Sequence, residues 1–196
     1  LPLLGLGVTA ACRSTGLVAS KVDEGTGQDE TRVVAREIAA KLKAAEEGLT
    51  RLKSPLSRIV EGGWKIPMDF DALGRIQGEE GYLAVVHADG NRMGQRVTNL
   101  ASRFPTAVDN RGYIEAMRHF SQEVEKAAKK ALTATTDLLA DALLADPELP
   151  WDGEHFPFRP IVFGGDDVTF VCNGRYGLAL AVRYLQAFEN ATAQSD

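Results

Sequence analysis

The chain has 196 residues, 44% of them hydrophobic, which is enough to bury one full core and part of a second. Its 22 Lys and Arg stand against 27 Asp and Glu, so the net charge is -5 and the sequence pI is near 5.3. This balance excludes the overall positive charge typical of duplex-binding proteins, and any contact with nucleic acid must be local. Polyphosphates stay allowed as ligands if divalent cations supply the positive charge at the site.

The cysteines and the N-terminal residues predict the cellular compartment of the protein. Cys12 and Cys172 form no CxxC motif and have no histidine at metal-finger spacing, so we expect a reducing cytoplasm and no structural zinc. The apolar residues 1–8 lack a basic leader and are interrupted by Pro2 and two glycines, so we expect neither a signal peptide nor membrane association. Because the chain does not begin with Met, we expect a fragment of a longer polypeptide or a processed form.

The first 80 residues are predicted to form a smaller N-terminal segment. Residues 1–27 are rich in Gly, Ser and Thr, and no chemistry can be assigned to them. Apolar residues recur every three to four positions over residues 29–52, which predicts an amphipathic helix. Residues 53–81 contain prolines and several glycines, which indicates a connection with at most short elements. We therefore predict two domains, residues 1–80 and 81–196.

The second domain is predicted to begin with a strand and to contain two helices. The apolar run over residues 82–87 suits a strand buried on both faces, and it ends at Asp89 and Gly90. Helical periodicity extends over residues 113–144 and again over residues 176–188. Between these helices, two β-rich runs flank a glycine-containing turn, which predicts a hairpin. The order strand, helical region, hairpin, helix is most of a ferredoxin-like α+β unit that lacks its fourth strand.

Three aspartates are predicted to meet at one edge of this sheet. Asp89 ends the first strand, and Asp166 and Asp167 lie in the hairpin turn. Carboxylates crowded together repel one another unless a cation compensates, and Mg²⁺ is the cation that prefers such oxygen ligands together with substrate phosphates. The sequence therefore predicts catalytic carboxylates that bind Mg²⁺ or Mn²⁺ and act in phosphoryl transfer.

Glycines beside the acids suit a phosphate-bearing ligand. Gly164 and Gly165 permit positive φ and let a triphosphate or a base approach the hairpin turn. Gly90 and Gly94, on either side of Asn91, leave backbone N–H groups free to meet phosphate oxygens where the strand gives way to a helix. These five residues are the predicted nucleotide contacts.

The two motifs resemble one known family. Residues 83–94 read LAVVHADGNRMG and residues 160–168 read PIVFGGDDV, and together they resemble the palm of the CRISPR polymerases, the large subunits of type III CRISPR effector complexes and their minimal relatives. The resemblance covers roughly residues 81–190. More distantly, the hairpin resembles that of the GGDEF nucleotide cyclases. The resemblance to the CRISPR polymerases implies a palm with a GGDD hairpin that takes ATP with Mg²⁺ or Mn²⁺ and makes cyclic oligoadenylate in antiviral defence.

The resemblance also implies residue roles and partners. Asp89 takes the first-strand metal position, and Asp166 and Asp167 take the hairpin positions. The family often has an acidic residue where Asn91 stands, which affects the ligands of a second ion. The implied partners are a nucleoside triphosphate, a second palm, and other effector subunits with guide RNA if the chain belongs to a larger complex.

Other readings of the same residues stay open. A palm can persist as a catalytically silent subunit that binds nucleotide or another protein, and Asn91 and the missing strand favour that reading. A GGDEF-like cyclase that makes a cyclic dinucleotide is a second alternative. His87 precedes Asp89 in the apolar run and is predicted to be a hydrogen-bonded core residue rather than a proton shuttle. Cys172 is predicted to be a buried apolar residue.

Overall fold

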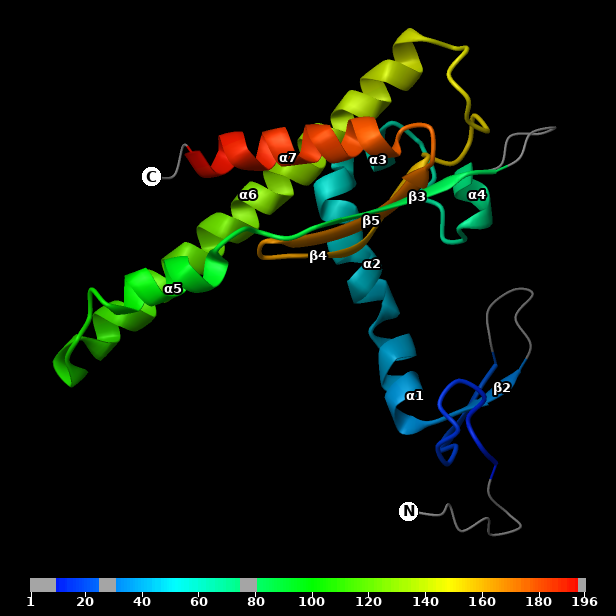
Figure 1. The fold of residues 1–196 in the computed structure, drawn as a ribbon. Coiled ribbons are helices and arrows are strands. Elements are labelled where there is room, and N and C mark those ends of the chain that lie inside the picture. The colour runs from blue at the N-terminus through cyan, green and yellow to red at the C-terminus, as the bar shows by residue number, and fades with distance from the viewer. Residues whose placement is uncertain (1–9, 25–30, 75–80, 194–196) are drawn as a thin grey trace. The chain divides into compact units, whose positions relative to one another are not determined.

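The computed structural model of the protein describes residues 10–24, 31–74 and 81–193 (Figure 1). By compactness the chain divides into two units, Leu1–Leu52 and Lys53–Asp196, which are described separately. A domain boundary at residues 80/81 stays a prediction, and the apolar run of residues 1–8 lies outside the described residues. None of the described helices is both long and apolar enough to span a bilayer.

The first unit combines a small hairpin-like sheet with helices. Strands β1 (Lys21–Asp23) and β2 (Arg32–Val34) pair antiparallel, and α1 (Arg36–Lys43) and α2 (Ala45–Lys53) follow. The helix predicted over residues 29–52 therefore begins later than expected, at Arg36, and it is divided into two helices at Ala44. Val33 and Val34 are β-branched and find partners in β1, and this pairing outweighs the helical spacing that they share with the residues after them.

Residues 53–74 form short helices that belong to the second unit. They are η1 (Ser54–Leu56), α3 (Ser57–Glu61) and α4 (Asp71–Gly74). Leu56 and Ile59 are almost completely buried in the core of this unit. The segment predicted as a connection thus has the short elements expected of it, and it also contributes side chains to the core.

The second unit contains a three-stranded antiparallel sheet with the order β3-β5-β4. Its strands are β3 (Leu83–Ala88), β4 (Phe158–Gly164) and β5 (Asp167–Asn173). Because both β3 and β4 pair antiparallel with β5, they run parallel to each other on its two sides. This arrangement confirms the mixed α+β class, whereas the ferredoxin-like palm stays a prediction.

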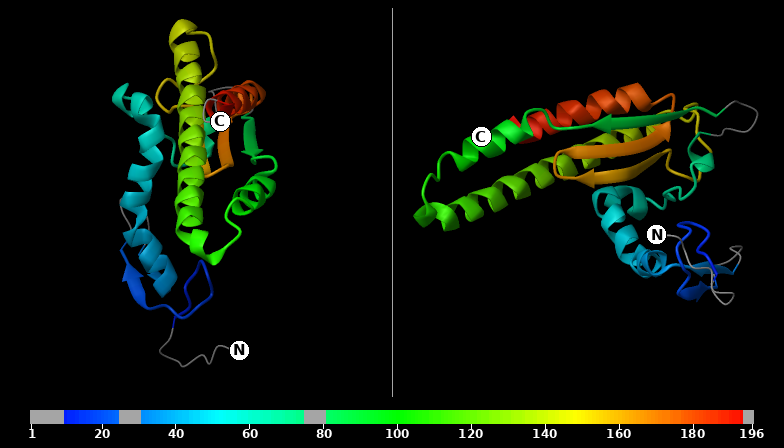
Figure 2. Two further views of the ribbon diagram at one scale, coloured as in Figure 1. Left: turned by 90° about the vertical axis from the view of Figure 1, so that its left-hand side faces the viewer. Right: turned by 60° about the horizontal axis from the view of Figure 1, so that its bottom comes forward.

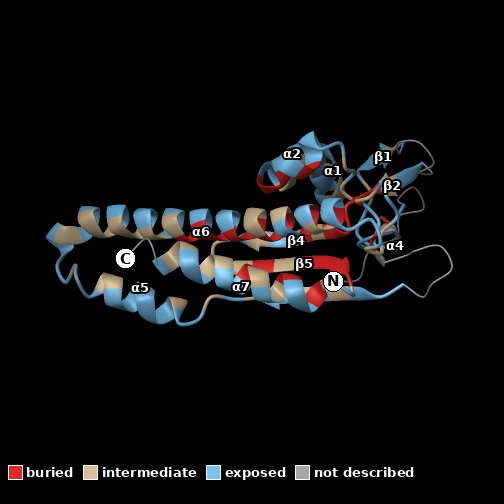
Figure 3. Ribbon diagram, turned by 90° about the horizontal axis from the view of Figure 1, so that it is seen from above, coloured by how far each residue is buried: buried red, intermediate tan, exposed pale blue. Residues whose placement is uncertain are grey.

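Two long helices cover one face of the sheet. Helix α6 (Asn110–Ala145) packs on β4, α7 (Gly177–Ala193) packs on β3 and β5, and the two helices pack on each other (Figure 2). The buried residues of α6 lie along the side that faces the sheet (Figure 3). Pro147 follows the last turn and cannot continue the helix. The long helix predicted over residues 113–144 is confirmed, with three further residues at its start and one at its end.

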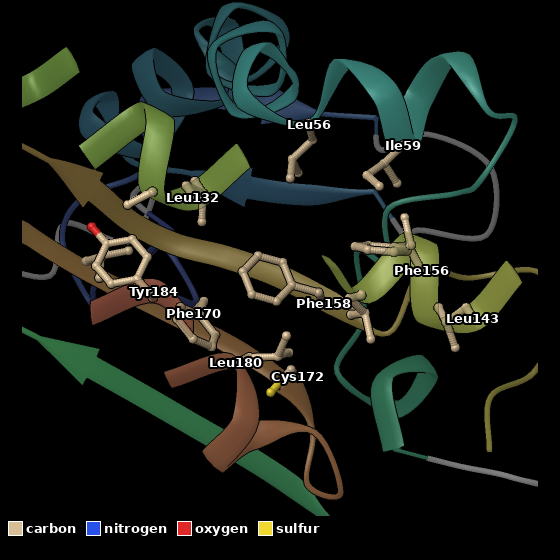
Figure 4. Packing of buried hydrophobic residues seen from close by; sticks show 14 residues of the cluster. Leu56, Ile59, Leu132, Leu143, Phe156, Phe158, Phe170, Cys172, Leu180 and Tyr184 are labelled. Carbon is tan, nitrogen blue, oxygen red and sulfur yellow. The ribbon is translucent and has the colours of Figure 1, made fainter. Parts of the chain in front are cut away.

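The core lies between this face and the helices (Figure 4). Aromatic rings form its centre, with Phe158 and Phe170 at 4.7 Å between centroids and Phe170 and Tyr184 at 6.4 Å. The predicted burial of Cys172 is confirmed, and burial raises the pKa of its thiol to about 12. The fully buried cluster consists of Leu56, Ile59, Ala131, Leu132, Leu139, Ala140, Leu143, Phe156, Phe158, Val168, Phe170, Cys172, Leu180 and Tyr184.

The opposite face of the sheet is covered only in part. Helix α4 contacts β5, where Val171 is buried. Alternate residues of β3 are exposed on this face, and Val85 keeps 68% of its surface accessible. The prediction that this strand is buried on both faces is therefore wrong. Among the described strands β3 has a partner on one side only, so its apolar run is half-buried at a sheet edge.

Candidate functional site

The end of β3 and the β4–β5 turn lie together at one end of the sheet (Figure 2). Ala88 and Val168 form the last pair of the β3–β5 ladder at this end. Asp89 follows Ala88 and Asp167 precedes Val168, so the two aspartates continue the two strands from opposite positions. Gly90 brings the loop still closer to the turn. A Cβ atom on Gly90 would lie 2.6 Å from the Cβ of Asp166 and 2.8 Å from its Oδ2. Only glycine leaves room for Asp166 at this position.

The turn itself contains the residues predicted to meet a nucleotide. Gly164 pairs with Asp167, which leaves Gly165 and Asp166 as the two turn residues. Gly165 has a φ of 62°, a conformation that glycine adopts without the penalty paid by other residues. A Cβ on either glycine would meet nothing within 4 Å, so the space around the turn is open. The turn is therefore uncovered on the side of its two glycines.

The loop after Asp89 has a strained backbone and leads into a helix. Arg92 has a φ of 62°, and it is the only non-glycine residue with positive φ among the described residues. Such a conformation costs about 1–3 kcal/mol and is concentrated at functional sites. Helix α5 (Met93–Ala101) begins at the next residue, and no side chain caps its N-terminus. Asn91 and Gly94 are exposed, which leaves the start of α5 accessible to a ligand.

His87 lies beside the acidic end on the open face, so its prediction as a core residue is wrong. Its side chain is 61% exposed. Nδ1 lies 2.9 Å from Oγ1 of Thr169 and 3.4 Å from Oδ1 of Asp167. Strand alternation explains the position, because His87 shares a face with the exposed Val85 rather than with the core-facing Val86.

Two polar atoms, one on β5 and one on α7, are buried without a hydrogen-bond partner among the described residues. One is Oδ1 of Asp167 and the other is the hydroxyl of Tyr184. Burial, and after it the negative charges of Asp167 and Asp166, raise the pKa of Tyr184 to about 12. Tyr184 lies in the helix predicted over residues 176–188, and the sequence analysis gave it no role. No local signal could have revealed it, because its neighbours are set by how α7 packs on the sheet.

The three aspartates share one end of the sheet but do not form a closed metal cage. No three His, Cys, Asp or Glu side chains in the described residues are arranged so that they could hold a metal ion by themselves. The available donors are nevertheless suitable for a hard cation. Carboxylate oxygens are its preferred ligands, and among the described residues one of those on Asp167 has no hydrogen-bond donor.

A cavity of about 440 Å³ lies between α5 and α6. Its apolar lining includes Leu100 and Phe120, and the cationic Arg96 and Arg103 line it as well. Neither guanidinium has a hydrogen-bond or ion-pair partner among the described residues. Only the packing of α5 beside α6 brings these arginines together, so the sequence alone could not reveal them. The lining residues are Arg96, Asn99, Leu100, Arg103, Ala116, His119, Phe120, Glu123, Val124 and Thr192.

No protein-family model and no curated protein matches the chain. The assignment of a function therefore depends on the residues and geometry described above.

Proposed function

We propose that the protein is a metal-dependent nucleotidyltransferase that joins ATP molecules into cyclic oligoadenylate as part of CRISPR-type antiviral defence. The observation that carries this proposal is the contact between the two acidic motifs. Gly90, directly after Asp89, lies against Asp166, so motifs 77 positions apart in the sequence meet at one end of the sheet. A turn with no chemical role would not need a second acidic loop beside it.

The order of the strands supports a palm. In a ferredoxin-like unit the first strand and the second run parallel on either side of the third, and helices cover one face. Strands β3, β4 and β5 have this arrangement, with α6 and α7 on one face. The acidic end and the partly open face are then available to a substrate.

The acidic residues fit a divalent cation that is shared with the substrate. Mg²⁺ is commonly held by one or two carboxylates together with phosphates and water, so a closed protein cage is not required. Asp89 and Asp166 are the proposed principal ligands, and Asp167 is an additional ligand or orients one. When bound, the cation lowers the pKa of an attacking hydroxyl and neutralises charge on the leaving group.

The surrounding residues bind and orient the nucleotide. The uncapped N-terminus of α5, with Gly90, Asn91 and Gly94, offers backbone N–H groups to phosphate oxygens. Gly164 and Gly165 leave the hairpin turn open on the other side. The cavity beside α5 suits a nucleobase against its apolar lining, with arginines near the phosphates. In the reaction, a 3′-hydroxyl oxygen bonds to the α-phosphorus, the bond to the β-phosphate oxygen breaks, pyrophosphate leaves and the hydroxyl proton passes to water.

A catalytically silent palm is the second candidate. Asn91 stands where the resembling family often has an acid, and three acidic side chains are not gathered into a cage in the described residues. Such a palm would bind nucleotide as a subunit of a CRISPR effector complex without turnover. A cyclase that makes a cyclic dinucleotide differs from the main proposal in product size alone.

The test is incubation of the purified chain with α-labelled ATP, GTP or both, in Mg²⁺ or Mn²⁺. Pyrophosphate release is followed and products are sized by mass spectrometry. The Asp166→Asn, Asp167→Asn double variant removes two adjacent negative charges from the turn, and Glu46→Gln, Glu47→Gln removes two from the exposed face of α2 as a matched control. Cyclic adenylates that disappear only in the first variant support the proposal. Full activity in that variant contradicts it, and metal-dependent ATP binding without turnover supports the silent palm.

A further inference from the structure

The two edges of the three-stranded sheet differ in how they are protected against a further strand. Strand β4 forms one edge, where Arg159 and Pro160 are part of the strand and the pairing register is interrupted between Pro160 and Val162. Charge, proline and bulges are the usual means by which an edge strand avoids pairing with another chain. The β4 edge is therefore unsuited to a further strand.

The β3 edge has none of these features. Strand β3 pairs with β5 over all six residues, Leu83–Ala88, without a register shift, and it contains no proline and no Lys, Arg, Asp or Glu. No other described strand pairs with its outer side (Figure 2). Unpaired N–H and C=O groups along an uncharged edge strand are a template for pairing with the strand of another molecule. The β3 edge is thus suited to an extension of the sheet.

An exposed apolar stripe on α7 lies on the same side of the molecule. Helix α7 packs on β3, and its stripe consists of Leu178, Val182 and Leu185, which keep 81%, 46% and 55% of their surface accessible. These residues are four and three positions apart, so they share one side of the helix. Arg183 lies across the helix from Leu185, and its Nε donates to the carbonyl oxygen of Ala134 on α6. The α7 stripe therefore faces away from α6 and towards the side of the β3 edge.

We propose that the β3 edge and the α7 stripe together form a twofold interface with a second copy of this chain. About an axis perpendicular to the sheet, β3 pairs antiparallel with its counterpart, and the three strands of each copy join into one sheet. Val85, which is 68% exposed, faces its own counterpart when the axis passes through it, and the two α7 stripes meet on the helix side. The acidic ends then lie at opposite ends of the joined sheet, so this interface does not rest on the proposed function.

The distribution of charge favours a second copy as the occupant. The chain has a net charge of -5, so two copies repel each other wherever acidic surfaces meet. The residues of β3 and of the α7 stripe include no Lys, Arg, Asp or Glu, so two copies can meet here without opposing like charges. The same lack of charge gives no electrostatic attraction for a strongly acidic or basic partner. An uncharged strand edge beside an apolar stripe is complementary to itself.

The size of this surface indicates a weak dimer. Strand β3 is about 20 Å long, and the strand layer and the helix layer are each about 10 Å thick. These dimensions give roughly 400 Å² on each copy, about half of what each partner contributes to a protein interface of standard size. We therefore expect a dimer with a Kd of about 10–100 μM, which forms and dissociates with concentration.

The test is sedimentation equilibrium of the chain from about 1 μM to 1 mM, with urea unfolding of each variant as a check of folding. Val85→Lys and Leu185→Lys place a charge on the strand edge and on the stripe, and each is expected to raise the Kd about tenfold or more. Val108→Lys is the matched control. Val108 is 92% exposed and lies in η2 (Ala107–Asp109), which packs on α6, so this variant should keep the Kd of the wild type.

A mixture of two variants tests the twofold pairing of β3. Val85→Lys and Val85→Glu are each expected to be monomeric where the wild type is a dimer, and an equal mixture is expected to dimerise because opposite charges then face each other at the axis. A mixture that stays monomeric overturns the pairing. A wild type that is monomeric throughout the concentration range, or a dimer that Val85→Lys and Leu185→Lys leave intact, overturns the proposal as well, and the β3 edge is then left to a strand from a different polypeptide.

Discussion

The two ends of the three-stranded sheet each hold a glycine against a close neighbour, but the neighbours differ. At one end, Gly177 of α7 lies against Ala84 of β3, where an added Cβ would overlap the alanine side chain. At the other end, Gly90 lies against the charged side chain of Asp166. The first approach brings a helix onto a strand, and it stabilises the fold. The second places a carboxylate beside an acidic loop, which gives no comparable packing.

The two ends also differ in backbone conformation and in hydrogen bonding. The left-handed Arg92, the unpaired Oδ1 of Asp167 and the unpaired hydroxyl of Tyr184 are all at or near the acidic end. At the far end, Asn173 accepts a hydrogen bond from the backbone N–H of Arg175, and Tyr176 is paired with Pro150. Oδ1 of Asp137 and Nε of Arg159 are buried without a hydrogen-bond partner among the described residues as well, and Arg159 lies towards the far end, so the feature that distinguishes the acidic end is the left-handed backbone of Arg92. Backbone strain of this kind is concentrated at functional sites.

The largest effect is expected from Gly90→Ala at the acidic end. The new Cβ displaces Asp166, and a misplacement of about one ångström in a catalytic group lowers turnover by about a hundredfold. Turnover and urea unfolding of the same samples are the measurements. Gly48→Ala, at an exposed helical position with nothing within 4 Å of the added atom, is the control and keeps full turnover. Unchanged turnover in Gly90→Ala contradicts the role given to the contact.

Gly177→Ala tests the far end in the same way. Overpacking against Ala84 is expected to lower the free energy of unfolding by about 1–3 kcal/mol, with turnover per folded molecule unchanged. The substitution Ala84→Gly in the same chain removes the overlapping atom and is expected to restore part of the stability. A loss of turnover without a loss of stability would show that the two ends do not have separate roles.

Thr169→Val sharpens the comparison on the open face. It keeps the β-branched shape and removes the hydroxyl that contacts Nδ1 of His87, so stability is expected to fall by about 0.5–1.5 kcal/mol at most. The His87 imidazole then loses its fixed orientation, which nuclear magnetic resonance of the ring nitrogens detects. An unchanged ring signal contradicts the contact.

The smallest effect is a pH dependence at the far end, in the loop before β4. Burial acts to raise the pKa of Asp152, but hydrogen bonds from the backbone N–H groups of His155 and Glu154 and from the His155 ring outweigh it and lower the pKa. The stabilisation is therefore present above the ordinary carboxyl pKa of 3.8 and is lost as the pH falls through the lowered value. Urea unfolding of the wild type and Asp152→Asn should differ at about pH 7 and converge at low pH. A difference that persists in acid would contradict this assignment.

The sequence predicted what depends on local pattern. The long periodic helix, the apolar burial of Cys172 and the mixed α+β class follow from spacing and hydrophobicity, and the structure has all three. The sequence-based prediction failed where contacts with other elements determine the local structure. Val33 and Val34 form a strand because β1 is available to them, and His87 is exposed because β3 lies at a sheet edge.

For the candidate site, the sequence identified the acidic residues and their glycines but not what surrounds them. Tyr184 and the arginines beside α5 come from helices whose packing no local pattern reveals. The close approach of Gly90 to Asp166 likewise depends on the register of β3 against β5. A motif identifies the residue types at a site, whereas the residues that surround them are determined by how the whole fold packs.

The proposed function requires that the two acidic motifs bind a divalent cation together. Its most direct test is a crystal structure of the chain with Mn²⁺ and a non-hydrolysable ATP analogue, with manganese located by its anomalous scattering. We expect a manganese peak bound by Asp89 and Asp166 and by phosphate oxygens of the analogue. An analogue bound elsewhere, or a peak that contacts neither aspartate, would contradict it.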